Sequence, residues 1–262
     1  MPKVSVLMST YNDARFLPEA LNSVLSQSFA DWELLVINDA SSDTTEEILR
    51  DYHSRDARIN FSTNLSQKGL ITNLNFALAK AQGEFVARLD SDDIWIDENK
   101  LKKQISFLNE NPDYCLVGTW AEVVDESSKK LYNFTPPDKD REIRKEILWH
   151  NCFVHSSIMA RRKNILDAGG YNPEQKYTED YALWLKMGVS SKFANLPEIL
   201  VRYRVKAAGI TQTKNLTQIS AVLTLVKAYQ TRYPGYFKAK IKWWLQRLFT
   251  AIVGPKNLVK FK

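Results

Sequence analysis

Residues 85–93 read FVARLDSDD, an apolar run that ends in three closely spaced carboxylates. A short apolar run between polar segments predicts a buried strand. The same pattern occurs earlier, where the apolar run 4–8 precedes STYND and the run 34–37 precedes NDASSD. Between these strands the spacing of apolar residues predicts helices over 18–25, 44–52 and 70–81, with a short strand at 59–62. Alternating strands and helices predict an α/β fold, a parallel sheet covered by helices.

The second half of the chain has a more mixed pattern. It predicts strands at 115–124 and 156–160, a loop at 132–140 around two consecutive prolines, and helices at 100–109, 141–148 and 181–187. In open α/β sheets, ligands bind beside the carboxyl ends of the strands. We therefore expect the functional site at the polar loops that follow the first strands.

The composition indicates a globular protein with an uneven distribution of charge. The chain has 262 residues, 44% of them hydrophobic, which is enough for a core without disulfide bonds. Cys115 and Cys152 lie in apolar runs and are expected to be buried free thiols. The short first apolar segment and the lack of any run of 18 apolar residues favour a cytoplasmic protein without a transmembrane helix. Residues 199–262 carry 13 Lys and Arg and no acidic residue, whereas the 198 residues before them carry 23 basic and 30 acidic residues.

The carboxylates at 90–93 repel one another unless water, backbone N–H groups or a cation offsets their charge. Mg²⁺ and Mn²⁺ favour carboxylate oxygens, and Mg²⁺ sites often combine one or two carboxylates with substrate phosphates. Asp90 and Asp92 are therefore candidate metal ligands. The alternative is a turn that caps a helix, which Asp also favours. These four residues alone do not decide between the two.

Polar residues after the first two strands suggest a binding site for a flat base. Asp39 lies too far ahead of the next helix to be a simple cap, and its carboxylate can accept a hydrogen bond from the N–H of a base. Tyr11 offers an aromatic face to the same base, although packing is its commoner role. Ser42 and Asp43 are expected to cap the helix that follows.

The segment 178–180 begins a helix with two acidic residues. Thr178 is a candidate N-cap, and acids in the first turn of a helix are favourable. The functional interpretation is that Asp180 is a general base that takes the proton of an acceptor hydroxyl. Trp184, four residues further on, shares its helix face and is a candidate platform for a sugar.

Taken in order, these motifs resemble the family 2 glycosyltransferases with the GT-A fold. Each segment is weak alone, but their order and spacing over residues 3–205 are specific. The resemblance is strongest to the soluble, non-processive members that build bacterial surface polysaccharide, since the Gln-x-x-Arg-Trp of processive synthases is absent. The segments are 4–12, 37–43, 87–93 and 178–180, supported by 64–75, 83–86, 155–162 and 169–171.

The resemblance implies a Rossmann-like, mostly parallel central sheet flanked by helices. It implies a GT-A domain over 1–205, with a nucleotide-binding half at about 1–95 and an acceptor-binding half at about 96–205. A basic helical extension would occupy 206–262. The implied activity is inverting transfer from a UDP-sugar to a hydroxyl of a glycan or polyprenyl-linked glycan, in the synthesis of lipopolysaccharide, capsule or exopolysaccharide.

The resemblance also implies roles for individual residues. Asp90 and Asp92 would hold Mn²⁺ or Mg²⁺ across the diphosphate, and Asp180, with Glu179 beside it, would be the catalytic base. The other nucleotide-binding residues would be Thr10, Tyr11, Asp39, Lys68, Arg88 and Ser91. Candidates for contact with acceptor or phosphate are His155, Trp184 and Lys206, although a structural role is the alternative for His155.

Two positions depart from the family pattern. Many relatives carry an arginine where this chain has Leu74. Relatives often have a histidine where this chain has Lys206, and a protonated lysine cannot be a metal ligand. Lys206 is expected instead to neutralise phosphate directly, so metal dependence is expected to be weaker than in relatives.

Three rival functions remain at this point. A phosphatase of the haloacid dehalogenase type carries its Asp-x-Asp on the first strand, with Thr or Val two residues later, where this chain has Ile94 after a later strand. A nucleotidyltransferase needs a Gly-rich basic loop after the first strand, which residues 10–15 do not supply. A catalytically inactive nucleotide-sugar-binding module is disfavoured by the four intact aspartates.

The basic tail contains a predicted amphipathic helix over 236–252. Such a helix lies in a membrane interface, where anionic lipid attracts its basic residues. The alternative is a helix packed on the catalytic domain with a solvated lysine face. No nucleic-acid binding is expected, because the basic residues accompany an apolar face. The apolar residues are Phe237, Ile241, Trp244, Leu245, Leu248, Phe249 and Ile252, and the basic ones are Lys238, Lys240, Lys242 and Arg247.

Overall fold

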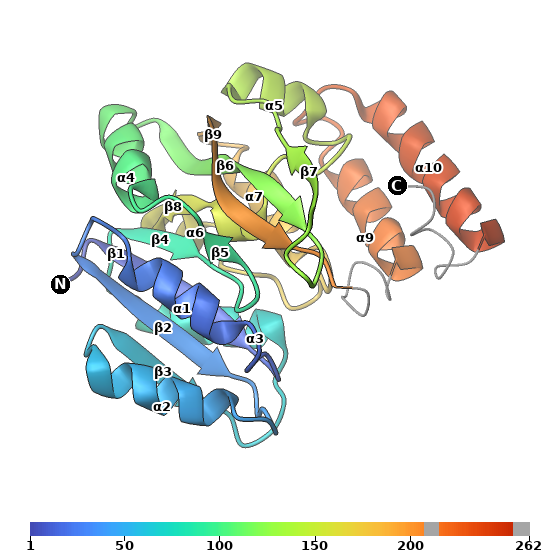
Figure 1. The fold of residues 1–262 in the computed structure, drawn as a ribbon. Coiled ribbons are helices and arrows are strands. Elements are labelled where there is room, and N and C mark those ends of the chain that lie inside the picture. The colour runs from blue at the N-terminus through green and yellow to red at the C-terminus, as the bar shows by residue number, and fades with distance from the viewer. Residues whose placement is uncertain (207–214, 254–262) are drawn as a thin grey trace.

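The computed structural model describes residues 1–206 and 215–253. In these ranges, nine strands form one mixed sheet (Figure 1). The strands are β1 Val4–Thr10, β2 Trp32–Asn38, β3 Ile59–Thr63, β4 Phe85–Arg88, β5 Ile94–Trp95, β6 Tyr114–Val124, β7 Lys130–Phe134, β8 Met159–Arg161 and β9 Lys192–Arg204. The strand order is β3-β2-β1-β4-β8-β6-β9-β5, with β7 paired to β6.

Helices cover both faces of this sheet (Figure 1). They are α1 Leu17–Leu25, α2 Thr45–Arg55, α3 Leu70–Lys80, α4 Lys100–Glu110, α5 Asp140–Glu146, α6 Arg162–Asp167, α7 Glu179–Met187, α9 Asn215–Ala228 and α10 Tyr236–Val253, with the 3-10 turn η1 at His155–Ser157.

The first half of the chain forms the parallel part of the sheet, as predicted. β1 pairs in parallel with β2 and β4, and β2 with β3, so the four strands end at one edge. Side chains alternate across β1: Val4, Val6 and Met8 pack against α1, α2 and α4, whereas Leu7 packs on the opposite side with α3 and α7. This burial on both faces explains the continuous apolar runs in the sequence.

The second half differs in several places from the prediction. The predicted strand at 156–160 is divided between η1 and β8, and the predicted loop at 132–140 begins inside β7. β8 joins the halves, since it pairs antiparallel with both β4 and β6. The sequence did not predict β5, β9, α6 or α9. β9 is interrupted by Pro197 and by register shifts against β6, so it has no simple alternating pattern.

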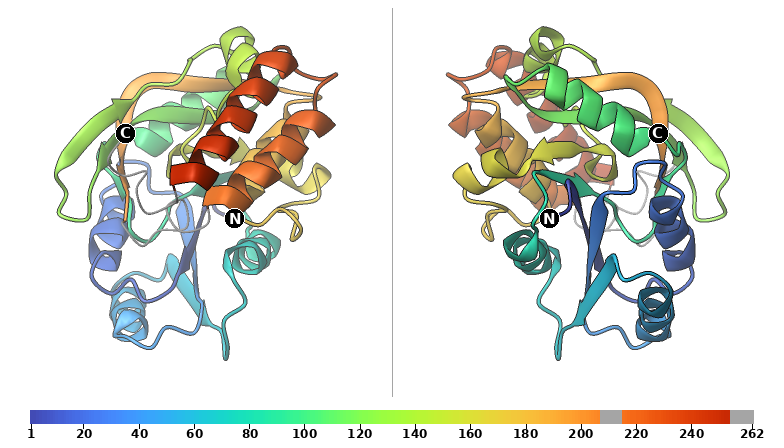
Figure 2. Two further views of the ribbon diagram at one scale, coloured as in Figure 1. Left: turned by 90° about the vertical axis from the view of Figure 1, so that its right-hand side faces the viewer. Right: turned by 90° about the vertical axis from the view of Figure 1, so that its left-hand side faces the viewer.

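The basic tail contributes two helices that pack side by side at one end of the molecule (Figures 1 and 2). The predicted helix over 236–252 is α10. The rest of the expected extension, 207–214 and 254–262, lies outside the described residues. Within the described parts of the chain, no helix is long and apolar enough to span a membrane. Cys115 and Cys152 are buried free thiols, as predicted.

Gly83 permits the close approach of two strands and provides a test of this packing. A Cβ at this position would lie 2.5 Å from the amide nitrogen of Ser5 and 2.8 Å from the carbonyl oxygen of Phe85. Because these are backbone atoms in paired strands, they cannot move cheaply. We expect Gly83→Ala to lower the free energy of unfolding by about 1–3 kcal/mol, measured by urea denaturation. Gly69→Ala is not a matched control, because Gly69 has a positive φ of 83°. An unchanged denaturation midpoint would contradict the prediction.

Candidate active site

The loops after β1 and β2 are joined at the carboxyl edge of the sheet. The backbone N–H of Asn12 donates to Ser41 Oγ at 3.0 Å, and Asn12 Oδ1 accepts from the N–H of Ser42 at 2.8 Å. Asp43 accepts from the N–H of Thr45 at 3.0 Å and from the N–H of Ala14 at 3.1 Å, but the N-cap position of α2 is held by Thr44 and not by Ser42 or Asp43 as predicted. The sequence assigned these residues to capping alone, but they also hold the two loops in one arrangement.

Asp39 is buried under the same edge and holds a third loop. Its Oδ1 accepts from Asn64 Nδ2 and from the N–H of Lys68, both at 2.8 Å, and its Oδ2 accepts from the N–H of Gly69 at 2.9 Å. Burial raises the pKa of Asp39, but these donors outweigh it and hold the pKa below its ordinary value. A carboxylate has about four acceptor positions. Asn64, Lys68 and Gly69 donate to it directly, and the side chain of Asn73 also lowers its pKa, so most of these positions are engaged by the protein.

The other candidate base-binding residues lie around Asp39. Tyr11 is 46% exposed, so its ring is accessible, whereas Thr10 is buried and its Oγ1 has no hydrogen-bond partner. The side chain of Lys68 is exposed, and its backbone N–H donates to Asp39. The edge therefore combines an accessible aromatic ring, a buried carboxylate and a buried hydroxyl without a hydrogen-bond partner.

The acidic loop after β4 is built on a buried arginine. Arg88 has no exposed surface, and its Nη2 pairs with Asp90 Oδ1, while its Nη1 donates to the carbonyl oxygen of Leu7 at 3.1 Å. Burial raises the pKa of Asp90, and the Arg88 charge outweighs this effect and lowers it. Arg88 was expected to bind the nucleotide. Its guanidinium is instead buried and paired with Asp90, so it holds the acidic loop in position.

Asp93 points inward and anchors the loop. Its Oδ1 accepts from the N–H of Arg204 at 2.7 Å, and its Oδ2 lies against Ser156 Oγ. Ser156 Oγ also accepts from the N–H of Asp90 at 2.9 Å. Burial, together with the charges of Asp92 and Asp90, raises the pKa of Asp93 well above its ordinary value. Asp93 is therefore a structural member of the acidic tetrapeptide.

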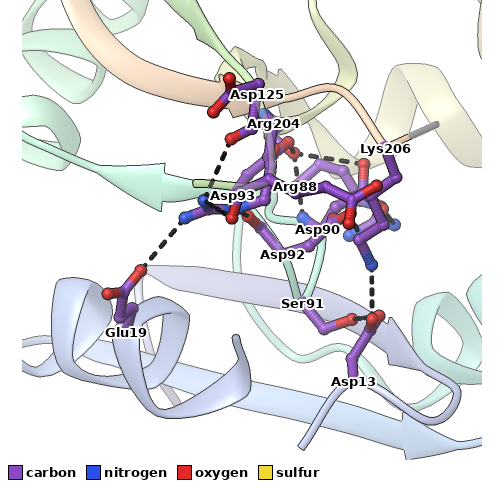
Figure 3. A network of polar contacts seen from close by, with 12 residues as sticks. Asp13, Glu19, Arg88, Asp90, Ser91, Asp92, Asp93, Asp125, Arg204 and Lys206 are labelled. Carbon is purple, nitrogen blue, oxygen red and sulfur yellow. Dashed lines mark hydrogen bonds and ion pairs between the residues drawn. The ribbon is translucent and has the colours of Figure 1, made fainter. Parts of the chain in front are cut away.

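Asp92 lies in an ion-pair network that joins the loop after β1 to the segment after β9 (Figure 3). Lys206 Nζ lies 2.9 Å from Asp92 Oδ2 and also pairs with Asp13, whose Oδ2 accepts from Ser91 Oγ at 2.7 Å. Burial and the neighbouring Asp90 raise the pKa of Asp92. Burial lowers the pKa of Lys206, but Asp92 and Asp13 outweigh it and raise the pKa, so Lys206 is a cation.

The chemistry of this donor set fits a divalent cation shared with phosphate. Asp90, Asp92 and Asp13 supply only oxygen ligands, and Arg88 and Lys206 together offset two of their three negative charges. Within residues 1–206 and 215–253, no group of three or more His, Cys, Asp or Glu is placed to hold a metal ion. The arrangement therefore suits a cation that completes its coordination with substrate oxygens.

Two acids begin α7 near the same cluster. Asp180 Oδ2 accepts from Asn151 Nδ2 at 2.9 Å. Burial raises the pKa of Asp180, and the negative charge of Asp90 raises it further. The hydrogen bond from Asn151 lowers the pKa, but the net shift is upward. Burial and the charge of Asp180 raise the pKa of Glu179 to about 7. Thr178 stands at the N-cap position but makes no capping hydrogen bond through its side chain.

The predicted sugar platform at Trp184 is wrong. Trp184 has no exposed surface and packs edge-on against Phe153 and His155 in the core. It does follow Asp180 on the helix, but its side chain is covered by Phe153 and His155 rather than open to a ligand. His155 is half-buried and its Nε2 lies 2.9 Å from the hydroxyl of Tyr171. Burial and the nearby Arg88 lower the pKa of His155 to about 3, so its ring is neutral.

Several residues of the site were not found from the sequence. Asp13 was visible in the polar segment after β1 and could have been included with Thr10 and Tyr11. Asn151, Ser156 and Arg204 carried no such signal, because their contacts with Asp180, Asp90 and Asp93 depend on long-range packing.

Comparisons with known proteins identify the family to which this chain belongs. Residues 5–170 match the model of the family described as Glycosyl transferase family 2. The chain is 34% identical over 213 residues to the Escherichia coli UDP-Glc:alpha-D-GlcNAc-diphosphoundecaprenol beta-1,3-glucosyltransferase WfgD, covering 80% of each chain. It is 36% identical over 208 residues to the Bacillus subtilis (strain 168) putative glycosyltransferase EpsE, covering 78% of this chain and 73% of that one.

Solved structures show the same fold. The mannosyltransferase PcManGT from Pyrobaculum calidifontis, in complex with GDP-Man and Mn²⁺, superposes with a TM-score of 0.69 at 19% identity, over 94% of this chain and 69% of that one. S. aureus TarS 1–349 in complex with UDP-GlcNAc gives a TM-score of 0.68 at 21% identity, over 86% of this chain and 66% of that one. With its GT-A fold and the matching family segment, this chain belongs to glycosyl transferase family 2 and is a glycosyltransferase.

Proposed function

We propose that this enzyme transfers a sugar from a UDP-sugar to a hydroxyl of a glycan or polyprenyl-linked glycan, with inversion, in the synthesis of a cell-surface polysaccharide. The carrying observation is that the acidic loop 90–93 and the acids Glu179 and Asp180 form one electrostatic cluster, in which the charge of Asp90 raises the pKa of Asp180. A donor diphosphate bound at the loop 90–93 would therefore lie close to an acceptor hydroxyl bound at Asp180. WfgD, whose printed name gives UDP-glucose and a diphosphoundecaprenol acceptor, supports the substrate classes.

The donor half, about 1–95, binds the nucleotide in this proposal. Tyr11 stacks on the uracil, Asp39 accepts from its ring N–H, and Thr10 lines the pocket. Lys68 and Ser91 face the phosphates, while Arg88 orients Asp90. Asp90 and Asp92 hold Mn²⁺ or Mg²⁺ against the diphosphate. When bound, the metal acts as a Lewis acid that stabilises charge on the leaving UDP. The neighbour with Mn²⁺ and GDP-Man supports a divalent cation.

The acceptor half, about 96–205, supplies the base. Asn151 orients Asp180, which takes the hydroxyl proton as the acceptor oxygen bonds to the anomeric carbon and the bond from that carbon to UDP breaks. Attack from the side opposite the leaving group gives inversion. His155 is neutral and paired with Tyr171, so we assign it to shaping the acceptor side rather than to proton transfer.

Turnover itself tests the proposal and separates the rival functions. We expect UDP release from a UDP-sugar panel when a glycan or a lipid-linked glycan is present, with Mn²⁺ or Mg²⁺ added. Donor binding without turnover for any acceptor would favour an inactive binding module. Release of pyrophosphate from a nucleoside triphosphate would favour a nucleotidyltransferase. We place this reaction in the cytoplasm, at the inner face of the membrane where a lipid-linked acceptor is presented.

Asp39 provides a test of the nucleotide pocket. We expect Asp39→Asn to weaken UDP binding by on the order of tenfold, because an amide lacks one of the acceptor positions and the charge of the carboxylate. Isothermal titration calorimetry measures the affinity. The matched control is Asp56→Asn, since Asp56 pairs with Arg58 away from this edge. If Asp39→Asn lowers the melting temperature but leaves UDP affinity unchanged, the carboxylate has only the structural role of holding the 64–69 loop.

The pair Glu179 and Asp180 predicts a pH dependence. A base must be unprotonated, and both carboxyls have raised pKa values, that of Glu179 being about 7. We therefore expect kcat/KM to fall as pH decreases through the raised pKa of Asp180, which titrates together with that of Glu179. Glu179→Gln removes one of the two repelling charges, so the acidic limb should move to lower pH. The pH profile of kcat/KM measures this effect, and an unmoved limb would contradict it.

A further inference from the structure

α10 presents an exposed apolar stripe on the side opposite to its packed face. Tyr236, Ala239 and Trp243 contact the core, and Thr250 is buried. With 3.6 residues per turn, these positions share one face of the helix. The opposite arc, about 100° wide by the same geometry, carries six large apolar side chains that are 46–75% exposed: Phe237, Ile241, Trp244, Leu245, Leu248 and Ile252.

Basic residues flank this stripe on both sides. By helical spacing Lys240 and Arg247 lie along one border and Lys238 along the other, and all three are exposed. Neither α9 nor α10 contains an acidic residue. Figure 2 shows α10 on the outer surface of the molecule, with α9 beside it. A stripe of this kind in water costs free energy, because contiguous exposed apolar surface is unfavourable.

We propose that α10 is a membrane-binding helix whose apolar stripe enters the surface of an anionic lipid bilayer. A helix in the interface buries its apolar face at the acyl boundary and keeps flanking lysine and arginine at the headgroups. Lys238, Lys240 and Arg247 have the sign that anionic headgroups attract. A second copy of this chain is the less suitable occupant, because pairing two such stripes brings basic borders together.

Contacts of α10 connect this surface to the acceptor side of the active site. Trp243 Nε1 donates to the carbonyl oxygen of Leu148 at 3.1 Å, and Lys242 Nζ donates to that of Trp149 at 2.6 Å. The same segment continues to Asn151, which orients Asp180. Trp149 is itself 41% exposed and extends the apolar surface beside Lys242. On the proposed function, α10 thus lies between the bilayer and the segment that positions the base, a separation of one helix diameter, about 10 Å, that suits an acceptor carried by a lipid.

Vesicle sedimentation of the full chain tests the proposal without requiring turnover. We expect pelleting with vesicles of phosphatidylcholine and phosphatidylglycerol, and little pelleting with phosphatidylcholine alone. Ile241→Glu/Leu248→Glu should reduce partitioning into the vesicles by at least about tenfold, since two side chains that would enter the bilayer become charged. Lys238→Glu/Lys240→Glu/Arg247→Glu should remove the preference for anionic vesicles. All substituted side chains are exposed, so folding should be retained, which thermal melting checks.

The matched control introduces the same charge at exposed apolar residues elsewhere. Phe76→Glu/Leu166→Glu changes side chains on α3 and α6 that are 45% and 44% exposed, and it should pellet like the unmodified chain. Failure of the unmodified chain to bind anionic vesicles would overturn the proposal, and so would equal binding by the α10 variants. A dimer in solution that Ile241→Glu/Leu248→Glu dissociates, without vesicle binding, would assign the stripe to a second copy. If the unmodified chain binds anionic vesicles but shows no turnover with any donor and acceptor, the proposed function would be rejected and this inference would stand.

Discussion

Asp180→Asn will lower kcat by about 10²–10⁴-fold and leave UDP affinity unchanged, if Asp180 is the base. An asparagine has nearly the same size but cannot accept the hydroxyl proton. It can keep a hydrogen bond to Asn151 through its carbonyl oxygen, so the start of α7 should retain its structure. UDP release measures kcat, and calorimetry measures UDP affinity in the same preparation. Because the donor pocket is built from other loops, the two measurements should separate.

Three companion variants make this result specific. Asp167→Asn is the matched control, because Asp167 is an exposed carboxylate paired with Lys163 on α6, and it should retain full activity. Asn151→Ala should lower kcat less than Asp180→Asn, since it disorders the base without removing it. Glu179→Gln should retain most activity at alkaline pH, because it leaves the carboxyl of Asp180 and its contact with Asn151 in place. If Asp180→Asn kept more than a tenth of the activity while Glu179→Gln lost it, the base would be Glu179.

The parallel half of the fold was predictable because its signals are local. The strands β1, β2 and β4 are short apolar runs buried on both faces, each helix has its own periodicity, and consecutive elements are neighbours in space. The acidic loop followed from the same reasoning, since β4 had to end where the polar residues begin. The strands β6, β8 and β9 pair across long separations in sequence, and their mixed directions are set by packing that no local pattern records.

The candidate site shows the same division. Asp39, Asp90, Asp92 and Asp180 could be located because each belongs to a local motif. The partners that decide their roles arrive from elsewhere: Ser156 from η1, and Arg204 from the end of β9. Trp184 illustrates the error in the other direction. Its helical spacing from Asp180 was right, but the periodicity of one helix cannot tell which side the rest of the protein covers.

Asp92→Asn is expected to weaken Mn²⁺ binding and to lower kcat/KM by about 10–100-fold or more. The carboxylate of Asp92 is half-buried, and repulsion from the charge of Asp90 raises its pKa. A metal held by Asp92 would offset this repulsion. An amide removes the charge and leaves only one oxygen ligand. Electron paramagnetic resonance of free Mn²⁺ measures binding directly, without turnover. Asp97→Asn is the matched control, because Asp97 pairs with Lys103 away from this loop. Equal Mn²⁺ affinity in Asp92→Asn and the unmodified enzyme would exclude Asp92 as a ligand.

Lys206→Ala should strengthen metal binding, in contrast to Asp92→Asn. The comparison tests whether the ammonium of Lys206 and the metal compete for the same carboxylates. Lys206 pairs with Asp92 and Asp13 where the cation is expected, so its ammonium competes with a metal for the same oxygens. Removing it should raise the Mn²⁺ affinity of the nucleotide-free enzyme by on the order of tenfold. With UDP present, the same ammonium can turn to the diphosphate, so residual activity in EDTA should fall in Lys206→Ala while activity in saturating Mn²⁺ is largely kept. Weaker Mn²⁺ binding in Lys206→Ala would instead mean that Lys206 holds the carboxylates in their ligating positions.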